Sequence, residues 1–238
     1  MLVKTYSSAV HGVDAQTITV EVNAGGNVGA GKIAYFLVGL PDNAVKESNH
    51  RIEAALKNVG YNMPRIKIVV NLAPADIRKE GSAYDLPIAI GILASTKQIE
   101  TPNLDHYIML GELSLDGGLR PIKGALPIAI QARKEKYKAI ILPKENAREA
   151  AIVNDIDVYG VESLKEAVEI LQGVSNLKPI IVDTRAEFAD KQNHINGIEN
   201  FWNQAKRHTR KFNGMPRQHL NLLLKECKWG FNMRKPKE

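Results

Sequence analysis

The chain has 238 residues, enough for one large domain or for one domain with an appendage, and 44% of them are apolar, enough for a buried core. It contains no apolar run of about 18 residues and no apolar signal-peptide core at its N-terminus, so we expect neither a membrane span nor secretion. The single cysteine, Cys227, excludes an internal disulfide framework. We therefore expect a cytoplasmic protein in which Cys227 is a small apolar helix residue rather than a nucleophile.

The net charge of +6 is distributed unevenly along the chain. Residues 1–184 hold 20 Lys+Arg and 21 Asp+Glu, whereas residues 185–238 hold 12 and 5. All seven Tyr lie in the first part, while both Trp and four of the five Phe lie in the second. Such asymmetry indicates a separate module with its own partners, often nucleic acid. We predict that two unrelated pieces are joined near residue 186.

The first 72 residues are typical of strands followed by a helix and a further strand. Three β-branched and aromatic stretches within residues 2–40 predict three strands. A helix is predicted to open at residues 41–43 and to end at Gly60. Five apolar residues fall close to one face of this helix: Val45, Ile52, Ala55, Leu56 and Val59. Residues 66–72 predict the next strand.

The stretch after residue 84 predicts a buried helix. Asp85 is the predicted N-cap, and Pro87 falls in the first turn, where proline is tolerated. The residues that come next, LPIAIGILAS, are apolar nearly all round, so the helix should lie inside the domain. A short strand pair is predicted over residues 107–119, with residues 116–118 as its turn.

From Pro127 onward, helices and strands alternate. The predicted elements are a helix from Pro127 to about residue 136, a strand at 138–143, a helix at 145–151, a strand at 156–160 and a helix at 162–172. This order describes an α/β domain with a mixed sheet and packed helices. Residues 174–193 are predicted to be irregular, with one candidate strand at 179–183. Two short helices come after them, and we expect this tail to be marginally stable alone.

Residues 26–32 match the G-x4-G-K part of a P-loop. The next residue is Ile33, where a P-loop has the Ser or Thr that holds Mg²⁺. Beyond it, the stretch AYFLVG predicts a strand, whereas a P-loop needs a helix N-terminus against the phosphate. We interpret the segment as a glycine loop between two strands and assign no nucleotide or other cofactor.

Three stretches carry a family resemblance: FLVGLPDNAVKESNHRIEAAL, VNLAPADIRKEGSAYDLPIAIGIL and GELSLDGGLRPIKGALPIA. Over about residues 1–175 the chain resembles the N-terminal domain of the ComM (YifB) family of magnesium-chelatase-like AAA+ proteins. The resemblance implies a Lon-protease-like fold. It also implies that an AAA+ ATPase module comes after this domain in the family, giving a DNA branch-migration helicase of competence (transformation) and DNA recombination.

Lon proteases use a Ser nucleophile activated by a Lys. Aligned with the Lon segments, this chain has Ala83 at the nucleophile position and Leu126 at the Lys position. Ser82 would require a one-residue slip, and Lys123 and Lys134 are out of place for the base. The resemblance therefore implies a Lon-like domain without a catalytic residue, and a Ser82-dependent peptidase is the alternative.

The Lon-like part also offers basic residues for DNA contact. The candidates are Lys67, Arg78, Lys79 and Arg120. We favour ordinary solvated charges as their interpretation.

The tail reads FADKQNHINGIENFWNQAKRHTRKFNGMPRQHLNLLLKECKWGFN. Over about residues 186–233 it resembles the C-terminal end of a DDE-type insertion-sequence transposase. The resemblance implies that Glu199 matches the last metal-binding carboxylate and Lys206 a DNA-contacting lysine. Asp183 and Asp190 do not lie on matching strands, so we interpret Glu199 as a relic. A transposase fragment with DNA-binding or residual metal-dependent strand-transfer activity is the alternative.

The sequence thus predicts a Lon-like domain at 1–175, a linker at 176–193 and a transposase remnant at 194–238. The partner expected is DNA, bound weakly and without sequence preference, with no membrane partner. The tail residues expected to contact DNA are Lys206, Arg207, Arg210 and Lys211. The spacing of His194, His208 and His219 is not that of a metal site, so we assign no metal. Without a P-loop, a Lon dyad or a complete set of transposase carboxylates, we expect no enzymatic activity.

Overall fold

The computed structural model describes residues 1–12, 14–26 and 34–182. Contacts divide the chain between Ile181 and Val182, and the helices and strands of the described residues all lie in the part up to Ile181. The predictions made for the tail, including Cys227, Glu199 and the basic DNA-contact residues, lie outside the described residues. So does most of the glycine loop.

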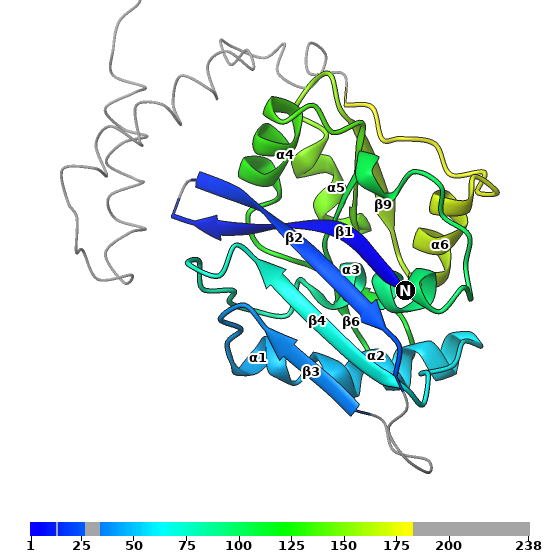
Figure 1. Ribbon diagram of the computed structural model, residues 1–238. Coiled ribbons are helices and arrows are strands. Elements are labelled where there is room, and N and C mark those ends of the chain that lie inside the picture. Colours follow the sequence, from blue (N-terminus) through cyan, green and yellow to red (C-terminus); the bar gives the residue numbers. More distant parts are fainter. Residues whose placement is uncertain (13, 27–33, 183–238) are drawn as a thin grey trace, which may run out of the picture. The chain divides into compact units, whose positions relative to one another are not determined.

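A seven-stranded sheet with the order β3-β4-β2-β1-β5-β8-β9 forms the centre of the domain (Figure 1). Its strands are β1 (Leu2–His11), β2 (Asp14–Ala24), β3 (Ala34–Val38), β4 (Lys67–Ala73), β5 (Tyr107–Met109), β8 (Ala139–Pro143) and β9 (Asp157–Val161). β2 runs antiparallel to both of its neighbours, and the other neighbouring pairs are parallel. The predicted mixed α/β class is confirmed.

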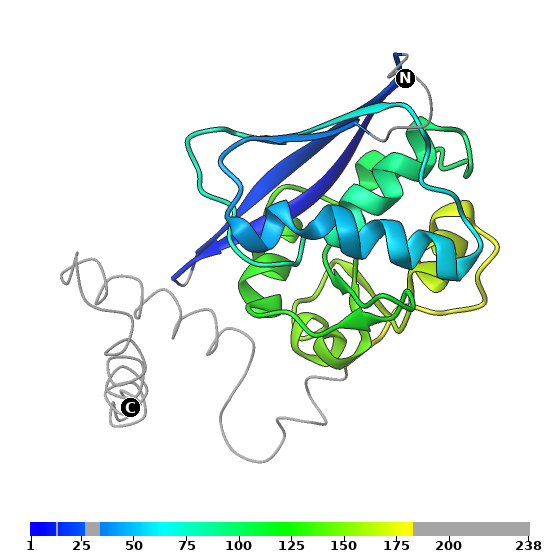
Figure 2. The same ribbon diagram turned by 90° about the horizontal axis from the view of Figure 1, so that it is seen from below.

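Helices pack against this sheet. They are α1 (Asn43–Lys46), α2 (Ser48–Val59), α3 (Asp85–Ser95), α4 (Ala125–Lys134), α5 (Lys144–Ala150) and α6 (Leu164–Gln172), with one 3₁₀ turn, η1 (Leu104–His106). α3 packs on β1 and β2, and α2 contacts both α3 and α6 (Figure 2). α4 contacts β2 and α5, and α5 packs on β8 and β9.

The two ends of the sheet differ in how they are covered. In β8, Ile141 belongs to the main core, and Ile140 and Leu142, which point to the other face, are equally buried. In β3, Tyr35 and Leu37 pack against the core, but Phe36 and Val38 on the other face are about half exposed. Side chains therefore fill both faces at the β8 end and only one face at the β3 end.

The predicted helix after Pro41 is two helices, α1 and α2, which meet at Glu47. Asp42 caps α1 by accepting a hydrogen bond from the Val45 backbone N–H at 2.9 Å. Gly60 ends α2 with a φ of 94°, a left-handed conformation that glycine adopts without strain. The predicted apolar face is confirmed: four of its five residues are fully buried, and Val59 packs against the same core.

Two predicted strands need correction. Residues 107–109 form β5 in the main sheet, and the hairpin consists only of β6 (Glu112–Leu113) and β7 (Leu119–Arg120). Residues 179–182 form no strand. The Ile180 backbone N–H donates a single hydrogen bond to the Val158 carbonyl oxygen, at 2.8 Å. One bond beside a short edge strand is too little to make a ladder.

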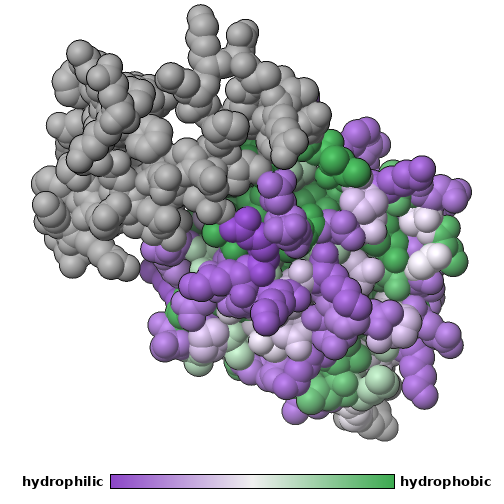
Figure 3. All heavy atoms as spheres, turned by 90° about the horizontal axis from the view of Figure 1, so that it is seen from above, coloured by the Kyte–Doolittle hydropathy of each residue, from purple (hydrophilic) through white to green (hydrophobic). Residues whose placement is uncertain are grey.

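No helix within residues 1–12, 14–26 and 34–182 is long and apolar enough to cross a membrane. On the face seen in Figure 3, hydrophilic residues predominate and hydrophobic residues form separate areas.

Limited proteolysis is expected to cut between about residues 174 and 195. α6 ends at Gly173, and within residues 174–182 backbone hydrogen bonds are few, so this segment can adapt to a protease. Trypsin should spare Lys178, because Pro179 comes next, and should cut at Arg185. Mass spectrometry should find a stable fragment ending at Arg185; early cuts within residues 34–172 would contradict the predicted boundary.

Candidate functional site at the start of helix α3

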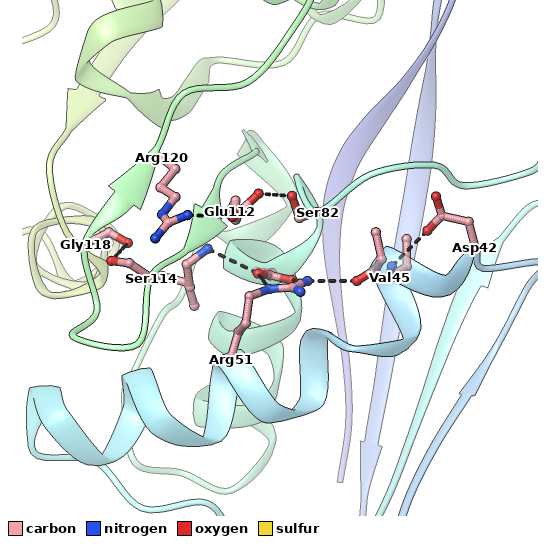
Figure 4. Close-up of polar contacts among 11 residues, drawn as sticks. Asp42, Val45, Arg51, Ser82, Glu112, Ser114, Gly118 and Arg120 are labelled. Atoms are coloured by element: carbon pink, nitrogen blue, oxygen red, sulfur yellow. Dashed lines mark hydrogen bonds and ion pairs between the residues drawn. The ribbon is translucent and has the colours of Figure 1, made fainter.

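The segment where the Lon resemblance places a nucleophile folds against the β6 strand (Figure 4). The Gly111 backbone N–H donates to the Ala83 carbonyl oxygen at 2.9 Å, and the Leu86 N–H donates to the Gly111 carbonyl oxygen at 3.1 Å. Gly111 also leaves room for the Leu119 side chain of β7, since a Cβ there would lie 2.4 Å from the Leu119 Cδ2 atom. These two backbone hydrogen bonds therefore fix the start of α3 to Gly111.

Asp85 is not the N-cap that the sequence predicts. It is the first residue of α3, and its carboxylate faces Arg51 of α2, with Oδ2 2.6 Å from Nε and Oδ1 3.0 Å from Nη2. Asp85 Oδ2 also accepts the Leu113 backbone N–H at 3.2 Å. The Asp85 side chain is 1% exposed. A buried carboxylate gains more from a two-point bond to guanidinium than from capping its own helix, which explains the difference.

Arg51 extends this contact to a further element. Its Nη2 atom also donates to the Ala44 carbonyl oxygen of α1 at 2.8 Å. Burial raises the pKa of the Asp85 carboxyl to about 6, although the Arg51 guanidinium lowers it. The pair therefore joins α1, α2, α3 and β6 at one buried point.

Ser82 lies beside this pair, and its hydroxyl donates a hydrogen bond to Glu112 Oε2. Glu112 Oε1 is 3.6 Å from Arg120 Nη1, in an ion pair whose arginine side chain is 65% exposed. Figure 4 shows Ser82, Glu112 and Arg120 in a row. The partner of the Ser82 hydroxyl is therefore a carboxylate, not a lysine amine.

The other Lon-related positions are two apolar residues and two exposed lysines. Ala83 has no functional group, and Leu126 is held by its backbone N–H, which donates to Glu149 Oε1 at 3.0 Å. Lys123 is exposed to solvent, and so is Lys134.

The four basic candidates of the Lon-like part lie in different environments. Lys79 is fully buried, and its ammonium donates to the Pro74 carbonyl oxygen, so the favoured interpretation of a solvated charge is wrong for it, and so is the alternative of a DNA contact. Burial also lowers the Lys79 pKa. Lys67 lies over the Phe36 ring, with Nζ 5.4 Å from the centroid. Arg78 pairs with Glu80 at 3.7 Å, while Arg120 pairs with Glu112.

The described residues offer no cluster of metal ligands. No group of three or more His, Cys, Asp or Glu side chains that could hold a metal ion occurs among them.

A pocket of about 580 Å³ lies at the far end of α3, lined by residues that include Val3, Ala94, Lys97 and Leu104. The described chain resumes at Ala34 in β3, a strand, whereas a P-loop leads into a helix.

The family model of subunit ChlI of Mg-chelatase matches residues 20–146, more than half of the chain. The chain belongs to this ChlI family. The ChlI-family chain is 40% identical over 189 residues to competence protein ComM of Haemophilus influenzae, covering 78% of this chain and 36% of that protein. It is 41% identical over 168 residues to YifB of Escherichia coli, covering 71% and 32%.

A separate match joins the ChlI-family chain to a transposase-like protein of Haemophilus influenzae. The two are 52% identical over 59 residues, which is 25% of this chain and 48% of that protein. The chain spans about a third of the length of the ComM and YifB relatives.

Proposed function

We propose that residues 1–181 form a non-catalytic, Lon-protease-like binding domain of a ComM-like protein that serves DNA recombination and transformation. The observation that carries this proposal is the partner of Ser82. A Ser–Lys dyad needs a lysine amine at the hydroxyl, and here Glu112 occupies that place, itself paired with Arg120.

Glu112 is a poor substitute for a lysine base. The reference pKa of glutamate, about 4.3, lies far below that of lysine, about 10.4, so a glutamate accepts a proton from serine much less readily. In this arrangement Ser82 and Glu112 hold the segment before α3 against β6. Ser82, Glu112 and Arg120 therefore have a structural role: they fix the start of α3.

The second part of the proposal concerns the tail. The basic surplus of residues 185–238, together with the 52% identical transposase-like match, supports a transposase-derived tail after the ChlI-family domain. An insertion element that landed in a ComM-like gene accounts for both pieces. Sequencing the locus tests this origin; a reading frame continuing uninterrupted into an ATPase module would contradict it.

DNA binding by the full chain should be weak and should depend strongly on salt. Filter binding of a duplex at increasing salt should give a linear fall of log affinity against log salt concentration, because phosphate contacts release counterions. A variant with Lys206, Arg207, Arg210 and Lys211 changed to Gln should lose about 0.9 of slope per phosphate contact removed.

The matched control removes the same charge elsewhere. Four exposed lysines of the near-neutral part serve for it, Lys97, Lys123, Lys134 and Lys138 changed to Gln. The control should retain the wild-type slope. A wild type without salt dependence, or equal losses in the two variants, would contradict a DNA-binding tail.

The transposase match also supports a second candidate function, a fragment with residual metal-dependent strand transfer. If the tail has this strand-transfer activity, the full chain with Mg²⁺ will nick supercoiled plasmid, and Glu199→Gln will abolish the nicking. A non-catalytic chain gives no nicking in either form.

A further inference from the structure

The two edges of the seven-stranded sheet are finished differently. At the β9 edge, the chain after α6 runs beside the strand, and Ile180 donates its backbone N–H to Val158. At the β3 edge, β4 is the one strand within the described residues that pairs with β3. Within residues 1–12, 14–26 and 34–182, no strand pairs with the outer backbone groups of β3, so on this side β3 is an edge strand.

β3 also lacks the features that usually protect an edge. Its sequence, Ala-Tyr-Phe-Leu-Val, contains no charge and no proline. Its pairing with β4 is regular from Ala34 to Val38, without a bulge. An uncharged, regular edge strand is a template for pairing with a further strand.

The outward face of β3 adds an apolar contact surface to this edge. Phe36 is 51% exposed and Val38 is 47% exposed, and Leu40, just beyond the strand, is 55% exposed. Figure 1 shows β3 at the border of the sheet. Phe36 and Val38 lie on one face of β3, and this exposed apolar pair on an edge strand indicates a surface that another chain covers.

We propose that the β3 edge pairs with β3 of a second copy of this chain, antiparallel and about a two-fold axis at Phe36. Full overlap of the five-residue strand places Phe36 opposite itself, Ala34 opposite Val38, and Tyr35 opposite Leu37. Every pair is apolar on both faces, so the strand is complementary to itself, as a two-fold contact requires.

The charge balance agrees with this occupant. Residues 1–184 hold 20 basic and 21 acidic side chains, so two copies of this part do not repel each other strongly. The cation over the Phe36 ring, Lys67, belongs to β4, one strand in from the junction. Pairing of one short strand makes a small interface, so association belongs in the micromolar rather than the nanomolar range. This self-association does not depend on the proposed DNA role.

The first test is sedimentation velocity of the full chain from low to high micromolar concentration. The wild type shifts from monomer to dimer, and Phe36→Lys stays monomeric because two ammonium groups would meet at the axis. Leu115→Lys is the matched control, since Leu115 is 59% exposed on the β6–β7 turn, and it dimerises as the wild type does. Circular dichroism of Phe36→Lys shows the wild-type spectrum.

The second test fixes the register by cross-linking. In a background with Cys227→Ser, Phe36→Cys places two thiols opposite each other, where Cβ atoms of paired strands lie about 5 Å apart. Val38→Cys in the same background is exposed to a similar degree, but its two copies lie roughly 14 Å apart along the antiparallel pair. Mild oxidation gives a covalent dimer with Phe36→Cys much faster than with Val38→Cys.

Three results overturn the proposal. They are a wild type that stays monomeric at every concentration, a Phe36→Lys variant that dimerises normally, and equal cross-linking of the two cysteine variants. A monomeric wild type whose oligonucleotide binding is lost in Phe36→Lys would assign the edge to nucleic acid instead.

Discussion

Gly39→Ala is expected to destabilise the domain by about 4 kcal/mol or more, or to prevent folding. Gly39 joins β3 to Pro41 with a φ of 103°. A Cβ atom there would lie 2.1 Å from the Leu72 carbonyl oxygen and 2.9 Å from the Leu72 nitrogen. Both are backbone atoms of β4, so a rotamer change cannot relieve the clash and β3 must move away from its partner. Urea unfolding followed by circular dichroism measures the loss.

Gly60→Ala is the matched control for this effect. Gly60 has a similar φ of 94°, and a Cβ there meets nothing within 4 Å. Its replacement should cost only the left-handed backbone strain, about 1–2 kcal/mol. Equal losses in the two variants would mean that the approach of Gly39 to Leu72 does not matter.

Loss of the Asp85 carboxylate is expected to destabilise the fold by about 3 kcal/mol. Asp85→Ala would leave Arg51, whose side chain is 19% exposed, without its counter-ion, and the Leu113 backbone N–H without an acceptor. Arg78→Ala removes an ion pair whose arginine is 70% exposed, and it should cost less than about 0.5 kcal/mol. Urea unfolding of both variants checks the contrast, and similar losses would contradict the buried role of Asp85.

The pH dependence of stability gives a second test of Asp85. Its pKa is raised from 3.8 to about 6 in the folded domain, so between these values the folded state retains a proton that the unfolded chain releases. The part of the stability that depends on protonation of Asp85 is therefore complete below pH 3.8 and is lost as the pH rises through 6, while the bonds of the carboxylate to Arg51 and Leu113 remain.

The Asp85→Asn variant is the reference for this effect, because an asparagine side chain does not titrate. The free energy of unfolding of the wild type should fall relative to Asp85→Asn by roughly 2–3 kcal/mol over this pH range and stay level above it. A wild type that gains stability over the variant across the same range would show that Arg51, rather than burial, determines the pKa.

Local sequence pattern predicts most elements of this fold and fails where a partner lies far along the chain. The face of α2 from Ile52 to Val59 and the apolar run of α3 are readable because their periodicity is local. The role of Asp85 is not, since Arg51 lies 34 residues away and capping is the local default for an aspartate at a helix start. The sequence misplaces β5 for the same reason, because its partners, β1 and β8, are distant in sequence.

The candidate site shows the same limit. The resemblance identifies Ser82, Ala83 and Leu126 as the residues to compare with the Lon dyad. No local signal indicates that Glu112, 30 residues after Ser82, is the partner of its hydroxyl. Sequence reasoning assigns Lys79 to the surface because lysine is rarely buried. Only the folded loop brings the Pro74 carbonyl oxygen to its ammonium, which makes burial acceptable.

Hydrolysis of a fluorogenic peptide library distinguishes the proposed non-catalytic domain from a Ser82-dependent peptidase. The full chain and its Ser82→Ala variant should both release fluorophore at the rate of buffer alone, because the Ser82 hydroxyl is bonded to Glu112 rather than to a lysine base. Turnover above buffer that disappears in Ser82→Ala would show that the domain is a peptidase with Ser82 as its nucleophile.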